Sequence, residues 1–200
     1  MAEAIIGLVG VLIGSAISLF QGYWNQRRLE KRAARYLAIR VICVLDKFIQ
    51  GCAEVLKDDG LSWGQRNKDG CLEPQVKVPG PPIFPDDIDW KSVDHDLMYK
   101  ILSMPSEVEA ADRMIEAASD FSTPPDFEEL FNERRYHYSG FGRHAVVLSN
   151  DLSNRYGIKK MVYNDWNPEN YFTCELEKAT ARRERVFEYS KNLTKDLKAS

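Results

Sequence analysis

The pattern of apolar and polar positions divides the chain into an uncharged N-terminal segment and a longer, charged remainder. Residues 4–26 carry no formal charge over 23 positions, and their centre is rich in Ile, Leu, Val and Phe. A helix of this length reaches about 34 Å, slightly more than the roughly 30 Å hydrocarbon core of a bilayer. The pattern therefore predicts a transmembrane anchor over residues 1–26 and a helical-bundle domain over residues 27–200.

Aromatic and basic residues directly follow the uncharged segment. Tyr23 and Trp24 are typical of the headgroup level, and Arg27 and Arg28 begin a basic cluster that ends at Arg35. Because Lys and Arg favour the cytoplasmic side, we expect an outside N-terminus and a cytoplasmic domain in a single-pass protein of the plasma or inner membrane. The same cations suit anionic lipid headgroups. A cleaved signal peptide would instead carry its basic residues before the apolar run.

Small residues recur at every fourth position of the predicted span, at Gly10, Gly14, Ser18 and Gly22. This spacing places them along one slowly rotating face, where two helix backbones can approach closely and pack by van der Waals contact. We therefore expect the span to form a homo-oligomer, although Gly and Ser are also common in membrane helices that do not pair. A pore is a weaker alternative, because no charged residue lies in the centre of the span.

Apolar residues spaced three and four apart predict that most of the remaining chain is helical. The pattern extends the first helix to about residue 57 and predicts further helices at about 94–104, 106–118, 124–156 and from 167 onward.

Local signals refine these boundaries and indicate the fold class. Pro105 is expected to end one helix, because proline breaks a helix interior, and Gly157 suits the position after a helix end. No segment alternates convincingly with the period of a strand. We therefore predict an all-α fold, in which the transmembrane helix continues into a cytosolic antiparallel bundle of about four main helices.

A long segment without helical periodicity, residues 58–89, contains four glycines and five prolines. Proline removes a backbone donor and extends the residue before it, so we expect an irregular connection. Loops of this length are usually functional or disordered. The apolar residues from Val76 to Trp90 favour a strap packed on the bundle, while the proline-rich run 78–85 could also be an extended ligand for a partner.

Composition limits the classes of partner. The 27 Lys and Arg residues nearly balance the 30 Asp and Glu residues, so the chain has no signature of a nucleic-acid-binding protein. The four cysteines are widely separated and contain no C-x-x-C pair, as expected of free thiols in a reducing compartment.

Polar residues that interrupt apolar helical faces mark a candidate polar pocket. Arg134 and Arg183 each fall within such a face, and a buried charge needs a partner unless its side chain reaches out to water. Glu133 and His137 lie one turn apart near Arg134, so these four residues are the candidates, with an exposed edge position as the alternative for each arginine.

The spacing of Glu129, Glu133 and His137 also allows a metal ion on one helix face. Metal sites in helical bundles usually add a Glu-x-x-His pattern and ligands from facing helices, which this sequence lacks. An exposed polar face explains these residues better, so no metal or cofactor is predicted.

The expected architecture resembles that of HEPN-type ribonucleases, which include membrane-linked members. Their motif places His four to six residues after Arg. Arg134 and Arg135 lie too close to His137 and too far from His144, and Arg143 is adjacent to His144. No nucleophile elbow, phosphate-binding loop or zinc-protease motif is present either.

These observations favour a membrane protein that acts as an oligomerising scaffold or binds an unknown cytosolic protein partner, with no evident catalytic activity. A membrane-tethered effector enzyme, of hydrolase or nuclease type, and a pore-forming effector are the alternatives.

Overall fold

The protein is an all-helical bundle. The computed structural model describes residues 2–160 and 166–199, and gives side chains for residues 14–15, 17–160 and 166–192. Its elements are α1 (Ala2–Lys57), the short 3-10 helix η1 (Trp90–Ser92), α2 (His95–Phe121), α3 (Glu128–Tyr156) and α4 (Pro168–Ala199). The described residues contain no strand, only an isolated bridge between Ser62 and Gln65. The predicted fold class is confirmed at this level.

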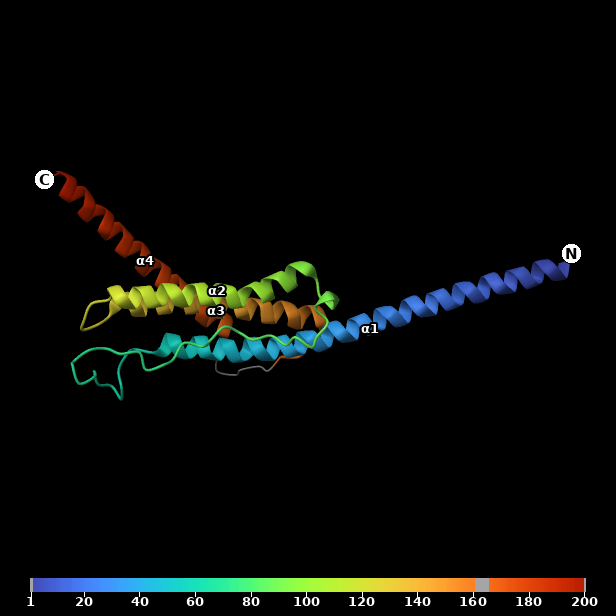
Figure 1. Cartoon of the computed structure of the whole chain (residues 1–200), viewed down its shortest axis with the longest axis horizontal. Helices are drawn as coiled ribbons and strands as arrows, with labels where there is room; N and C mark the ends of the chain where they lie inside the picture. Colours follow the sequence, from blue (N-terminus) through green and yellow to red (C-terminus); the bar gives the residue numbers. More distant parts are fainter. Residues whose placement is uncertain (1, 161–165, 200) are drawn as a thin grey trace.

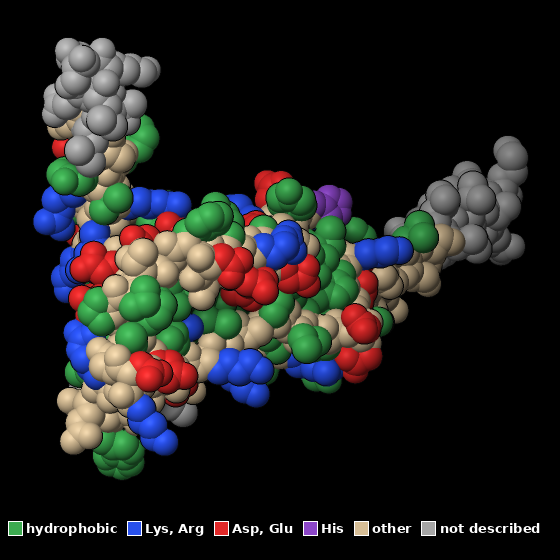
Figure 2. All heavy atoms as spheres, turned by 60° about the vertical axis from the view of Figure 1, so that its left-hand side comes forward, with side chains coloured by type: hydrophobic (Ala, Val, Ile, Leu, Met, Phe, Trp, Pro, Cys, Tyr) green, Lys and Arg blue, Asp and Glu red, His purple; other side chains and the backbone are tan. Residues whose placement is uncertain are grey.

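Helix α1 has two parts with different surroundings. Its first part projects from the bundle as a stem (Figures 1 and 2), with no other described element against it, and Ile17, Phe20 and Trp24 are each more than half exposed there. From Ala34 onward, the helix is part of the core. Among the described side chains, no helix contains an apolar stretch long enough to cross a membrane.

Helix α3 is central and runs opposite to the other three helices. Ser149 bonds Asp46 of α1, Tyr138 bonds Asp112 of α2, and Asn132 bonds Arg182 of α4, so each neighbour packs against α3. In Figure 1, α1, α2 and α4 run in one direction and α3 returns between them. The prediction of an antiparallel bundle therefore holds only in part. Helix α3 is antiparallel to its three neighbours, whereas α1 and α2 are parallel.

The strap over residues 58–89 explains this parallel arrangement. It leaves the end of α1 and runs back along that helix, so that α2 begins near the stem (Figure 1). Pro79 lies so close to Gly51 that an added Cβ would be 2.8 Å away, and Asp87 forms a 2.8 Å ion pair with Arg40. Val76, Val78, Phe84 and Ile88 pack on the core, which confirms the packed strap.

Two predicted helix boundaries were wrong. Helix α2 continues through Pro105, because Ile101, Met104 and Val108 are buried on both sides of the proline and their packing outweighs the lost backbone bond. Helix α3 begins at Glu128, about four residues later than predicted, since Phe127 has a left-handed φ of 48°.

The ends of the other connections agree with the sequence. Gly157 follows α3 with a φ of 61°, and Asn167 accepts a bond from the Asn170 amide at the start of α4. The core includes the fully buried side chains of Leu37, Leu45, Ile101, Met104, Tyr138, Leu148 and Phe172.

Candidate functional site

A groove lies between the second half of α2, the first half of α3 and the middle of α4. Both α2 and α4 pack on α3, and the space between them forms a cavity of about 480 Å³. Its walls include Met114, Phe121 and Val186, which are 51%, 82% and 59% exposed. The groove therefore combines unusually exposed apolar walls with a polar floor on α3.

Three of the four predicted polar residues lie together here: Glu133 and Arg183 line the groove, and His137 contacts Glu133 from beside it. Glu133 Oε1 lies 3.2 Å from a guanidinium nitrogen of Arg183, and Glu133 Oε2 lies 3.2 Å from His137 Nε2. The Arg183 guanidinium also lies over the ring of Tyr136, 4.2 Å from its centre. The carboxylate thus sits between an arginine of α4 and a histidine one turn further along α3.

This environment favours the neutral form of the His137 imidazole. Burial lowers its pKa, the Glu133 carboxylate opposes this effect, and the Arg183 charge lowers the pKa further. Neither His137 Nε2 nor Glu133 Oε2 has a partner in hydrogen-bonding geometry within the described part of the chain. A neutral imidazole beside a carboxylate could accept or relay a proton.

We expect acid to weaken folding through His137. Its folded pKa lies below the unfolded value of about 6.5, so the unfolded chain binds more protons as the pH falls. Its contribution therefore becomes less favourable from about pH 6.5 downward. Urea unfolding at pH 7.5 and pH 5.5 should show a smaller pH effect in His137→Gln than in the wild type. His144→Gln on the same helix is the matched control, and an unchanged pH effect in His137→Gln would contradict this assignment.

Arg134 does not join this cluster. It points to the other side of α3, where its guanidinium lies 3.1 Å from Asp58 Oδ2 and 2.7 Å from the Val76 carbonyl oxygen. Both side chains of the ion pair are buried, at 8% and 1% exposure. Asp58 also accepts bonds from the amides of Gly60, Gln75 and Val76. Arg134 therefore holds the strap to the bundle.

A second cavity of about 310 Å³ adjoins the groove and was missed by sequence reasoning. Arg135 of α3 and Arg182 of α4 both line it. The two arginines lie on polar helix faces next to Arg134 and Arg183, so single-sequence periodicity gave no reason to prefer them. Within the described residues, no group of three His, Cys, Asp or Glu side chains could hold a metal ion.

The predicted membrane residues lie on the stem. Tyr23, Trp24, Arg27 and Arg28 are exposed, and an added Cβ at Gly14 or Gly22 would meet no atom within 4 Å. The Ser18 hydroxyl donates to the Gly14 carbonyl oxygen at 2.9 Å. Gly10 lies outside the residues whose side chains are described.

Comparison with protein-family models, curated proteins and solved structures found no match to this chain.

Proposed function

We propose that the protein is a single-pass membrane scaffold, with the stem of α1 as its anchor and the bundle on the cytoplasmic side. One observation carries the proposal: a single uninterrupted helix of 56 residues forms both the stem and part of the core. Apolar side chains on the stem, such as Leu19 and Phe20, are 75% and 60% exposed, and no element among the described residues covers them. A bilayer would cover them, and the uncharged run 4–26 followed by basic residues fits that placement.

The same stem supports a homo-oligomer. Among the described residues, an added Cβ at Gly14 or Gly22 would meet no atom within 4 Å, and the Ser18 hydroxyl is already bonded within its own helix. A second stem could therefore approach along the small-residue face without leaving a polar group unpaired in lipid. Because α1 continues into the core, pairing of stems would bring two bundles together.

We expect the full chain to remain in washed membranes and to cross-link there as an oligomer. Gly14→Ile and Ser18→Ile should reduce the cross-linked fraction severalfold, because bulky side chains would separate the paired backbones. At Gly14 an isoleucine meets open space within one chain, so loss of cross-linking would report on contact between chains. Ala16→Ile is the matched control, because the helical period places position 16 on the side of the helix opposite the small-residue face.

Two outcomes would contradict the proposal. Recovery of the wild-type chain in the soluble fraction, and not in the membrane fraction, would refute the anchor. An unchanged cross-linking pattern in both variants would refute the small-residue interface. External protease should leave the bundle intact in sealed cells if the C-terminal domain is cytoplasmic.

A membrane-tethered hydrolase is the second candidate, favoured by the contacts of Glu133, at the groove, with both Arg183 and His137. A carboxylate and a neutral imidazole at ion-pairing distance could serve general acid and base catalysis. Loss of a cellular effect in His137→Gln with unchanged folding and cross-linking would favour the enzyme over the scaffold.

A further inference from the structure

Two guanidinium groups without an ion-pair partner face the smaller cavity beside the groove. Arg135 and Arg182 line it from different helices, and among the described residues neither forms an ion pair with a carboxylate. Arg135 is half-buried, whereas Arg182 is exposed at the rim. The cavity thus holds two positive charges that the protein itself leaves without a direct counter-charge.

Their hydrogen bonds are equally sparse. Within the described part of the chain, Arg135 donates only to the Asp58 backbone carbonyl oxygen, at 3.4 Å, and Arg182 donates to the neutral Asn132 Oδ1, at 2.9 Å. A guanidinium carries five N–H donors, so most of theirs remain available. Burial lowers the pKa of Arg135 and the nearby charge of Arg182 lowers it further, while the carboxylates of Glu175, Asp58 and Asp59 oppose these effects without reversing them.

Three carboxylates also line the cavity, and none of them forms an ion pair with either arginine. Asp126 pairs with Arg66 at 2.6 Å, and Asp59 accepts a bond from the amide of Leu61 at 3.0 Å. Glu128 is exposed at the rim, in the first turn of α3, where a helix dipole favours an acid. None of these carboxylates therefore neutralises Arg135 or Arg182 by a direct ion pair.

We propose that the cavity between Arg135 and Arg182 binds the phosphate or carboxylate group of a small amphipathic anion, whose apolar part lies in the adjoining groove. The planar fork of each guanidinium matches the paired oxygens of such a group. The cavity and the groove share Glu128, Asn132 and Arg182 in their walls, so the two spaces adjoin at these residues.

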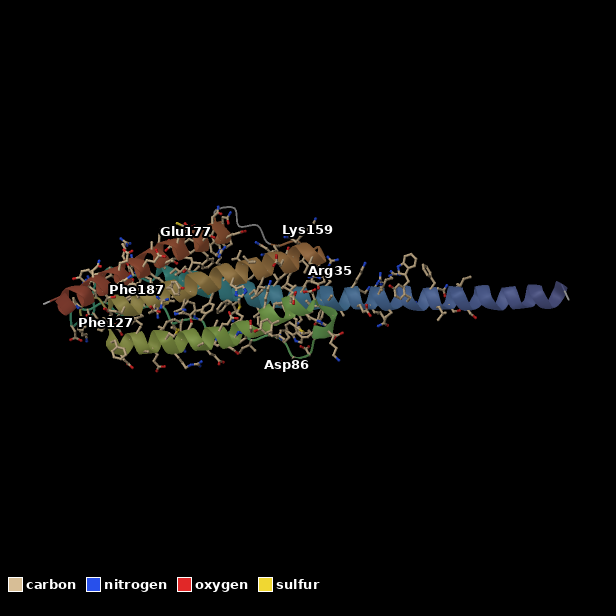
Figure 3. The ribbon with its side chains drawn as sticks, turned by 90° about the horizontal axis from the view of Figure 1, so that it is seen from above. Arg35, Asp86, Phe127, Lys159, Glu177 and Phe187 are labelled. Carbon is tan, nitrogen blue, oxygen red and sulfur yellow. The ribbon has the colours of Figure 1, made fainter. Side chains whose placement is uncertain are left out.

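The position of the cavity selects a soluble ligand over a lipid headgroup. Phe127 and Phe187 lie at the end of the bundle that holds the cavity. Arg35 lies at the opposite end, where α1 projects from the bundle (Figure 3). Residues 27–57 of α1 rise about 45 Å between the basic cluster and the strap residues of the cavity. A headgroup at the basic cluster could not reach Arg135. This step alone rests on the proposed anchor.

Phenyl phosphate is a suitable probe, because it joins a phosphate to one apolar ring. Titrated calorimetrically into the full chain in zwitterionic nanodiscs, it should bind saturably and about tenfold more tightly than inorganic phosphate. Arg135→Gln and Arg182→Gln should each weaken binding about tenfold or more. Glu128→Gln should tighten it, since a negative charge leaves the rim. Arg185→Gln, on the same helix but outside both cavities, should leave it unchanged.

A further variant and a folding control complete the test. Arg135→Lys retains a charge and should bind more tightly than Arg135→Gln, and unfolding curves identify any variant that fails to fold. Absence of saturable binding by the wild type, equal affinity for both phosphates, or equal weakening by Arg185→Gln would overturn the proposal. Competition by anionic lipid in the nanodisc would overturn the choice of a soluble ligand. If the chain proves to be soluble without a membrane, the same titration can be done in buffer. A failure of the proposed anchor is thereby distinguished from a failure of the proposed anion site.

Discussion

Asp58→Ala should destabilise the bundle by about 3–5 kcal/mol, because it leaves a buried charge without a partner. Arg134, at 8% exposure, would lose its carboxylate, and the amides of Gly60, Gln75 and Val76 would lose their shared acceptor. The change acts on α1, the strap and α3 together. Urea unfolding of the full chain in mild detergent, followed by far-ultraviolet circular dichroism, measures the effect.

The neighbouring position provides the control. Asp59 is exposed and accepts one bond, from the Leu61 amide at 3.0 Å. Asp59→Ala should therefore cost less than about 1 kcal/mol. Equal losses in the two variants would show that the Asp58–Arg134 pair does not hold the strap in place.

Gly142→Ala should cost about 1–3 kcal/mol, although alanine normally favours a helix. The added Cβ would overlap the ring of Phe172, and that ring is fully buried between α3 and α4, so it has no room to move. The free energy of unfolding should fall, and the α3–α4 contact should be lost earlier than the rest in hydrogen exchange.

Gly140, two residues earlier on the same helix, gives the opposite expectation. Its added Cβ would lie 4.0 Å from Leu176 Cδ1, at ordinary contact distance. Gly140→Ala should therefore stabilise the protein by about 1 kcal/mol through helix propensity. If both variants change stability in the same direction, the close approach of Phe172 does not govern this interface.

Local sequence signals were sufficient to predict where most helices lie in the chain, but not how the helices are arranged in space. The continuous apolar stripe predicted that α1 runs to about Lys57, and Gly157 marked the end of α3. Pro105 misled because the cost of a proline is local, whereas the burial that offsets it comes from α3.

The candidate site was predicted in part for a related reason. Glu133 and His137 are one helical turn apart, so their proximity follows from sequence spacing, and Arg183 was identified as a charge within an apolar face. Asp58 lies 76 positions from Arg134, and no local pattern connects them. The route of the strap decides that contact, and with it the separation of Arg134 from the groove.

The continuity of α1 has a mechanical consequence. Since the helix passes from stem to core without a hinge, rotation of the stem about its axis must turn the whole bundle by the same angle. One residue inserted near Ala33 would change the helical phase by about 100°. In a pair of stems joined along the small-residue face, that phase would decide whether the two grooves open toward each other or outward.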